Sequence, residues 1–244
     1  MAEPSRLYYW PMIPGRGEFV RMILEDVGAD YEDVARLPEP AGGTRALIPF
    51  MYGHGEGWPV FAPPILEVDG ELIAQTPAIA AFLGDRHGLV PDEPIHRAHA
   101  QQMMLTIADV VAEVHDTHHP ISVQLTYEQQ LEPARERAAA FTGNRLAKWL
   151  GYFEAVLGRE RGTYLIGDAH SYPDLALCVL LDGIEYAFPR AFAREMEGRD
   201  YLAGLRVRIH ERPRVAAYLS RPRHLAFNEK GIFRHYDELD LPDT

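Results

Sequence analysis

The chain of 244 residues is predicted to combine an α+β domain over residues 1–86 with an all-helical domain over residues 95–244, joined by a linker at 87–94. In the first domain, short apolar runs typical of strands alternate with amphipathic runs typical of helices. In the second domain, apolar residues recur at helical spacing and are interrupted by Pro or Gly. The sequence GDRHGLVPDEP, residues 84–94, marks the boundary because it is rich in Gly, Pro and charge.

A strand, a helix and a second strand are expected to open the chain. Arg6–Trp10 is rich in aromatic residues, as strands often are, and a turn follows at Pro14–Gly17. From Glu18 apolar residues recur at helical spacing, and Gly28 is a fitting C-terminal stop because glycine tolerates the left-handed conformation. Tyr31–Ala35 is the predicted second strand.

A hairpin and a helix complete the predicted domain. The apolar runs Pro64–Val68 and Glu71–Ala74 are joined by Asp69-Gly70, a dipeptide that favours a tight hairpin turn because both residues tolerate positive φ. Thr76 and Pro77 follow, a hydroxyl suited to cap a helix and a proline suited to its first turn. An open helix start binds anions through its free N–H groups, so a carboxylate is expected to dock there.

The element order so far is βαβ followed by ββα, which matches the thioredoxin-like fold. Residues 37–60 lie between the two units, are rich in Gly and Pro, and show no clean period. We expect this segment to be irregular with one short helix. Long loops of this kind in compact domains are often functional.

The second domain is predicted to be helical almost to the end of the chain. Ser171 and Asp174 are spaced as a capping box that opens one of these helices, directly before the apolar run LALCVLL. The predicted helices are His96–His119, Glu128–Leu157, Asp174–Tyr186, Tyr201–His210 and Arg214–Leu219.

Composition narrows the classes of function. The net charge of −12 argues against binding to nucleic acid or an anionic membrane, and 47% apolar residues support a proper core. No apolar run reaches the roughly 20 residues of a membrane helix, and the first ten residues lack the apolar core of a signal peptide. The single cysteine, Cys178, cannot form an internal disulfide and fits a reducing compartment, so a cytoplasmic location is expected.

The hairpin, the prolines before it and the pair Gln75-Thr76 resemble the glutathione-binding half of the glutathione transferases. In that family a cis-proline precedes the third strand, and Gln-Ser or Gln-Thr opens the next helix. The capping box, preceded by the Y-L-I-G-D sequence of Tyr164–Asp168, is similar to the one before the central helix of the family's helical domain. The resemblance implies glutathione as co-substrate, a small apolar electrophile as substrate, and a homodimer.

The reaction requires a group that stabilises the thiolate of glutathione. A thiol with a pKa near 8.5 is only about 3% ionised at pH 7, and a donor that lowers this pKa by about 2 units stabilises the anion by roughly 2.7 kcal/mol. The family pattern Y-[FW]-x, as in the tyrosine-type alpha, mu, pi and sigma classes, assigns this role to Tyr9. Its neighbour Tyr8 points to the opposite face of the strand. The alternative is that both tyrosines are ordinary strand aromatics.

The resemblance also implies the residues that hold glutathione. Gln75 and Thr76 would bind the γ-glutamyl carboxylate, with Arg16 as local positive charge in a turn one residue longer than the family's. Asp109 would reach across the dimer, or else be a solvated charge on a helix face. The full predicted set is Trp10, Arg16, Trp58 at the glycine end, the backbone of Pro63 and Pro64 against the cysteinyl unit, Gln75, Thr76 and Asp109.

Met12, His115 and Phe233 are predicted to line the pocket for the electrophile. Phe233 belongs to an aromatic C-terminal tail, which either covers the site or simply docks on the helical domain. His115, His118 and His119 are spaced for one helix face and could ligate a metal. No cysteine or carboxylate cluster lies in register with them, so we expect residues of the helix end or of the active-site rim and no bound metal. Two other functions stay open: a non-catalytic binding protein of this fold, and a glutathione-dependent isomerase. The sequence does not identify the electrophile.

Overall fold

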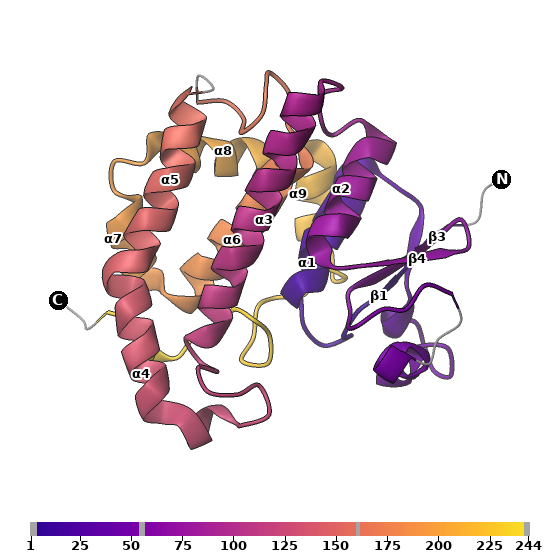
Figure 1. The fold of residues 1–244 in the computed structure, drawn as a ribbon, viewed down its shortest axis with the longest axis horizontal. Coiled ribbons are helices and arrows are strands. Elements are labelled where there is room, and N and C mark those ends of the chain that lie inside the picture. Colours follow the sequence, from indigo (N-terminus) through magenta and orange to yellow (C-terminus); the bar gives the residue numbers. More distant parts are fainter. Residues whose placement is uncertain (1–3, 54–56, 160–161, 242–244) are drawn as a thin grey trace.

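The computed structural model describes residues 4–53, 57–159 and 162–241 and confirms the predicted fold class. Figure 1 shows a small domain that contains the sheet beside a larger body of helices. The strands are β1 (Ser5–Tyr8), β2 (Tyr31–Asp33), β3 (Ile65–Val68) and β4 (Glu71–Ala74). They form one sheet in the order β2-β1-β3-β4, in which β1 is parallel to β2 and antiparallel to β3.

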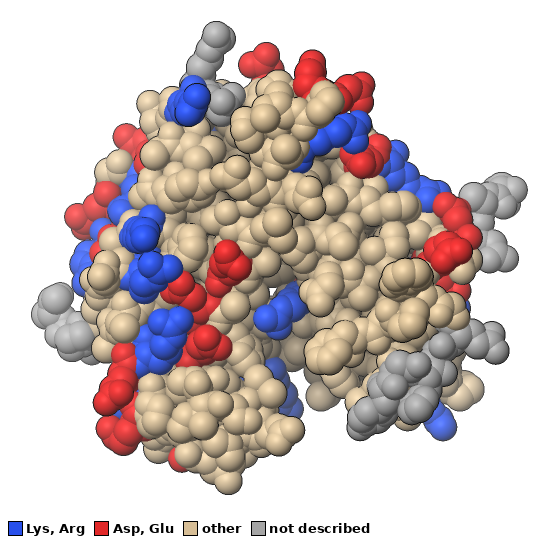
Figure 2. All heavy atoms as spheres, in the orientation of Figure 1, with Lys and Arg blue, Asp and Glu red and all other residues tan. Residues whose placement is uncertain are grey.

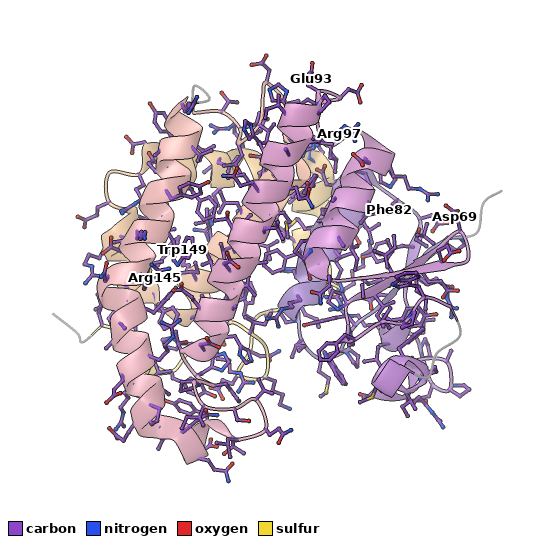
Figure 3. All side chains as sticks on the ribbon, in the orientation of Figure 1. Asp69, Phe82, Glu93, Arg97, Arg145 and Trp149 are labelled. Atoms are coloured by element: carbon purple, nitrogen blue, oxygen red, sulfur yellow. The ribbon has the colours of Figure 1, made fainter. Side chains whose placement is uncertain are left out.

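The β3–β4 hairpin turns at the predicted dipeptide. Asp69 and Gly70 have φ values of 52° and 81°, and Val68 pairs with Glu71 across the turn. Figure 3 shows Asp69 at the tip of this hairpin. Both central residues therefore occupy the left-handed region that Asp and Gly tolerate best, which confirms the hairpin prediction.

Two helices complete the small domain, and they pack against each other. Helix α1 (Gly15–Val27) begins three residues earlier than the periodicity predicted, because its first turn contains the glycines of the expected turn. It ends at Gly28, whose φ is 67°, as predicted. Helix α2 (Thr76–His87) extends into the predicted linker and ends at Gly88, which also has a φ of 67°.

The segment between β2 and β3 contains 3₁₀ helix at Val34–Arg36 and at Thr44–Gly53. The second is the one helix expected within residues 37–60. The first takes up the last two residues of the predicted strand Tyr31–Ala35, so β2 ends at Asp33. Tyr8, Leu47 and Ile65 contribute to a second apolar cluster on this side of the sheet. The bond between Pro63 and Pro64 is cis, as predicted for the entrance of β3.

The helical domain contains α3 (Pro94–Asp116), α4 (Leu131–Ala140), α5 (Leu146–Arg159), α6 (Tyr172–Ala187), α7 (Pro189–Met196), α8 (Asp200–His210) and α9 (Pro213–Leu219). A π-helical turn at Phe141–Arg145 links α4 to α5, so the long helix predicted at Glu128–Leu157 is interrupted. Helix α7 was not predicted. Its signal was present, since Pro189 suits a first turn and Phe188, Ala191 and Phe192 follow helical spacing.

Helix α6 is the central helix and is buried along most of its length. Its predicted capping box is present: Asp174 accepts hydrogen bonds from the Ser171 N–H at 2.7 Å and from the Leu165 N–H at 2.8 Å. Helix α6 also packs against α1, so one apolar core runs through both domains.

Ion pairs and hydrogen bonds tie α1 to the helical domain. Asp26 accepts hydrogen bonds from Arg212 at 2.5 Å and from His170 at 2.9 Å. The Tyr218 hydroxyl donates to Glu18 at 2.7 Å. None of the described helices is long and apolar enough to cross a membrane.

Candidate active site

The Tyr9 side chain lies beneath the start of α1. Its hydroxyl oxygen accepts a hydrogen bond from the Arg16 backbone N–H at 2.8 Å, and the residue is 4% exposed. The guanidinium carbon of Arg21 lies 5.7 Å from the centre of its ring. Because the oxygen accepts the Arg16 N–H, the phenolic proton remains available for a donor bond to another group.

Two glycines allow this close approach, and the sequence analysis did not assign them a role. A Cβ on Gly15 would lie 2.3 Å from the Tyr9 hydroxyl, and a Cβ on Gly17 would lie 2.5 Å from the ring atom Cδ1. Gly15 also has a φ of 46°. The signal was the G-R-G sequence at the start of a helix, where only glycine lets another side chain reach the backbone.

Burial raises the pKa of Tyr9 above its ordinary value. The N–H groups of Arg16 and Gly17 and the charges of Arg16 and Arg21 act in the opposite direction, because they stabilise the phenolate. The net direction is upward, so the phenol keeps its proton at neutral pH. A protonated phenol held by helix N–H groups is a good hydrogen-bond donor.

Tyr8 lies in a different environment, as expected from strand alternation. Its hydroxyl donates to Glu67 at 2.6 Å, and its ring packs edge-on against Phe50 with 4.7 Å between centroids. The hydroxyl and the ring of Tyr8 therefore both make contacts within the small domain.

Arg16, Gln75 and Thr76 come together at a cavity of about 210 Å³ between α1, α2 and α3. Gln75 precedes α2 with a φ of 70°, a conformation that costs a non-glycine residue about 1–3 kcal/mol and often marks a functional position. Thr76 is the first helical residue and not the cap: its hydroxyl lies 3.5 Å from the Arg16 carbonyl oxygen. No side chain caps the start of α2, so the helix start remains open to an anion.

The cis bond between Pro63 and Pro64 lies beside Tyr9. Tyr8 pairs with Ile65 in the antiparallel register of β1 and β3, so the next position places Tyr9 opposite Pro64. The backbone at the entrance of β3, the Tyr9 hydroxyl and the start of α1 thus border the same region.

Three of the predicted glutathione residues lie outside this cavity. Trp10 is partly buried and packs against the apolar cluster around Tyr8. Trp58 is 72% exposed, and Asp109 is exposed on α3. Their predicted contacts with glutathione stay predictions.

Met12, predicted to line the pocket for the electrophile, lines a hollow of about 480 Å³ beside the C-terminal tail together with Tyr186 and Phe227. Its role in binding the electrophile stays a prediction. The tail reaches the β1–α1 turn, since the Asn228 side chain donates to the Met12 carbonyl at 3.0 Å. Figure 2 shows a cleft between the two lobes in which Lys or Arg side chains are visible.

The other two predicted pocket residues, His115 and Phe233, lie in different environments from each other. His115 is partly buried, and burial together with the charge of Arg16 lowers its pKa to about 4, so this ring is neutral and lies within electrostatic reach of the site. Phe233 is 1% exposed and its ring packs against Gly183 in the core. Phe233 therefore anchors the tail and does not line the pocket. Cys178 is fully buried, as expected for a structural thiol.

Comparisons with known proteins agree with this architecture. A family profile described as "Glutathione S-transferase, C-terminal domain" matches residues 115–222. A glutathione S-transferase of Plasmodium yoelii yoelii is 27% identical over 175 residues, which cover 72% of this chain and 76% of the relative.

Two solved structures share the fold. Prostaglandin synthase D of Nilaparvata lugens has a TM-score of 0.69 at 18% identity, covering 90% of this chain and 98% of that one. The glutathione S-transferase of Ascaris lumbricoides has a TM-score of 0.65 at 24% identity, covering 91% of this chain and 100% of that one. The profile over residues 115–222 and the curated relatives support the assignment of the chain to the glutathione S-transferase family, and the solved structures show the same fold.

Proposed function

We propose that this protein is a glutathione transferase in which the Tyr9 hydroxyl stabilises the glutathione thiolate for attack on a small, partly apolar electrophile. The observation that carries the proposal is the Tyr9 hydroxyl: its oxygen accepts the Arg16 N–H, so its proton can be donated to sulfur. A donor of this kind that lowers the thiol pKa by about 2 units contributes roughly 2.7 kcal/mol and makes the thiolate the main species at pH 7.

The γ-glutamyl carboxylate would bind at the open start of α2. Gln75 and Thr76 offer polar groups there, and Arg16 supplies a positive charge on the same cavity. The cysteinyl unit would lie along the backbone of Pro63 and Pro64, which places its sulfur toward Tyr9. This arrangement uses the helix start as an anion site and the phenol as a thiolate donor.

The electrophile would enter from the cleft that Met12 and His115 approach. The Met12 side chain is 63% exposed, and a methionine adapts to apolar ligands of different shape. His115 is neutral and adds a polar group without a positive charge that would repel cationic substrates. A buried, unreactive Cys178 is compatible with the cytoplasmic location that we propose.

A homodimer is part of the same proposal. Phe61 is 91% exposed and Leu105 is 50% exposed, and apolar side chains this open are candidates for burial against a second copy. Leu105 and Asp109 are one turn apart on α3. Burial of Leu105 at the interface would therefore bring Asp109 toward the γ-glutamyl amine bound by the partner subunit.

The test is a calorimetric titration of glutathione into the wild type, Tyr9→Phe and Tyr8→Phe, with thiolate absorbance followed across pH. We expect all three proteins to bind glutathione, and only Tyr9→Phe to leave the thiol pKa near its free value. Tyr8→Phe is the matched control, because its hydroxyl is already bonded to Glu67.

If none of the proteins binds glutathione, the transferase proposal fails. If Tyr9→Phe still lowers the thiol pKa, the role of Tyr9 fails while the function stands. Analysis of products distinguishes conjugation from isomerisation, since an isomerase returns glutathione unchanged.

A further inference from the structure

Three histidines converge where α3 ends. Helix α3 stops at Asp116, so His115 lies in its last turn while His118 and His119 belong to the chain that turns away. Despite this, a ligand nitrogen of each ring lies within 4.8 Å of the others. The ring centroids are 4.9 Å apart for His115 and His118, 5.3 Å for His115 and His119, and 4.7 Å for His118 and His119.

The hydrogen bond of His118 determines which of its nitrogens is available. Its Nε2 lies 2.7 Å from the carbonyl oxygen of Ile232, which can only accept, so Nε2 carries the proton. In the neutral ring, Nδ1 then presents its lone pair, and it faces Nδ1 of His119 at 2.5 Å. A histidine whose outer N–H is bonded to a backbone carbonyl is the usual arrangement of a metal ligand.

We propose that His115, His118 and His119 bind one divalent transition-metal ion of the zinc type. Imidazole nitrogens suit Zn²⁺, Ni²⁺ and Cu²⁺, and three protein ligands leave a fourth position for water or another small ligand. Zinc–nitrogen bonds of about 2.0–2.1 Å in a tetrahedral site require nitrogens about 3.3 Å apart. The two Nδ1 atoms must therefore separate slightly, which a small rotation of the partly exposed His119 ring would allow.

The charges around the cluster set the expected strength of binding. Arg234 acts electrostatically on all three rings and Arg16 acts on His115, and both oppose a cation. Asp116 lies 4.0 Å from His115 and Glu128 acts on His119, and both favour a cation. We therefore expect binding that Arg234→Gln strengthens, because this variant removes the positive charge that reaches every ligand.

Metal binding would also hold the C-terminal tail. The Ile232 carbonyl that orients His118 belongs to the tail, and Phe233 beside it anchors the tail in the core. An ion bound by the ordered cluster and not by the unfolded chain raises the unfolding temperature, and the rise grows with the logarithm of the free ion concentration once this exceeds the Kd. The cluster shares His115 with the proposed electrophile pocket, but metal binding would require neither glutathione nor the Tyr9 hydroxyl.

The experiment uses the full chain without a histidine tag and after treatment with a chelator. Zn²⁺ is titrated by calorimetry, and Co²⁺ is titrated while its visible absorption is followed, because the band intensity reports tetrahedral nitrogen ligation. We expect one ion per chain for the wild type. His119→Asn, the variant least expected to disturb folding, should weaken binding by about tenfold or more.

The matched control is the double variant His96→Asn/His99→Asn, which removes two histidines at the other end of α3 and should bind as the wild type does. Circular dichroism verifies that each variant is folded. The proposal is overturned if the wild type shows no saturable binding, or if His119→Asn and His115→Asn bind the metal as tightly as the wild type.

Discussion

The Tyr9 hydroxyl and the Arg16 backbone N–H are joined by a hydrogen bond of 2.8 Å that links the end of β1 to the first turn of α1. The bond couples the position of the phenol to the conformation of the glycine-rich helix start. It also leaves the phenolic proton available, so one geometric relationship supports both the placement and the donor role of Tyr9.

Gly17→Ala should displace Tyr9, because the new Cβ would lie 2.5 Å from its ring. A misplacement of about 1 Å can cost about 10²-fold in rate, and we expect a loss of this order in kcat/KM. The control is Gly151→Ala in α5, where a Cβ meets no atom within 4 Å. This change should leave activity intact and stabilise the helix by about 0.5–1 kcal/mol. Equal activity of both variants would contradict the proposed dependence on Tyr9.

Arg16→Gln should weaken glutathione binding. The guanidinium is the positive group on the cavity that Gln75 and Thr76 share, and a hydrogen bond to a charged group contributes about 1.5–3 kcal/mol. We expect the Kd measured by calorimetry to rise by about tenfold or more, with a smaller dependence on salt. Arg45→Gln, at an exposed arginine of the same domain, should change neither quantity. An unchanged Kd for Arg16→Gln would place the carboxylate elsewhere.

Asp26→Asn should loosen the junction between the domains. Burial acts to raise the pKa of Asp26, but the hydrogen bonds from His170 and Arg212 outweigh it and the net pKa is lowered. The carboxylate therefore stabilises the fold above its unfolded pKa of about 3.9, and this stability is lost as the pH falls through the lower folded pKa. At pH 7 we expect the free energy of unfolding of Asp26→Asn, measured by urea denaturation, to be about 3 kcal/mol lower than that of the wild type, since a buried pair loses one partner.

The cost of Asp26→Asn should shrink below pH 4, where the wild-type carboxylate also becomes neutral. Asp69→Asn is the control, because Asp69 pairs with Arg86 at the exposed hairpin and its loss should have little effect. If both variants behave alike, the interdomain ion pair does not contribute as proposed.

Asp174 should show the opposite pH dependence. Burial raises its pKa to about 6, although hydrogen bonds from Ser171 and Leu165 oppose the shift. The folded state thus holds a proton that the unfolded state releases near pH 3.9, so this group lowers stability as the pH rises from about 4 to about 6. Asp174→Asn removes the titration, and its stability curve should lack this decrease, which amounts to about 3 kcal/mol at most.

The control for Asp174→Asn is Thr126→Ala, which removes the exposed Thr126 side chain from the capping box at the start of Tyr127–Gln130. The free energy of unfolding of Thr126→Ala should lie about 1 kcal/mol below that of the wild type and show the same pH dependence across this range. If the free energy of unfolding of the wild type does not fall between pH 4 and 6 relative to that of Asp174→Asn, the pKa of the buried Asp174 carboxyl is not raised.

Local rules were sufficient for most of the fold. The Asp69-Gly70 turn, the stop at Gly28 and the Ser171 capping box depend on residues within a few positions of one another, so their sequence alone defined them. The predicted helix ends were less accurate. The glycine-rich start of α1 is typical of a turn in the local sequence, and its helical conformation depends on the packing of Tyr9 against it. Helix α7 was not predicted, although Pro189 gives a clear local signal for its start.

The sequence by itself determined the fold class and, through its motifs, indicated the glutathione transferase family and Tyr9 as the candidate thiolate donor. Only the tertiary structure decided which distant residues share a site. Arg16 meets Gln75 because α1 and α2 pack together, and Phe233 lies in the core because Gly183 leaves room for its ring. The three histidines meet because the chain turns at the end of α3. Contacts of this kind depend on packing between distant segments, which local periodicity does not encode.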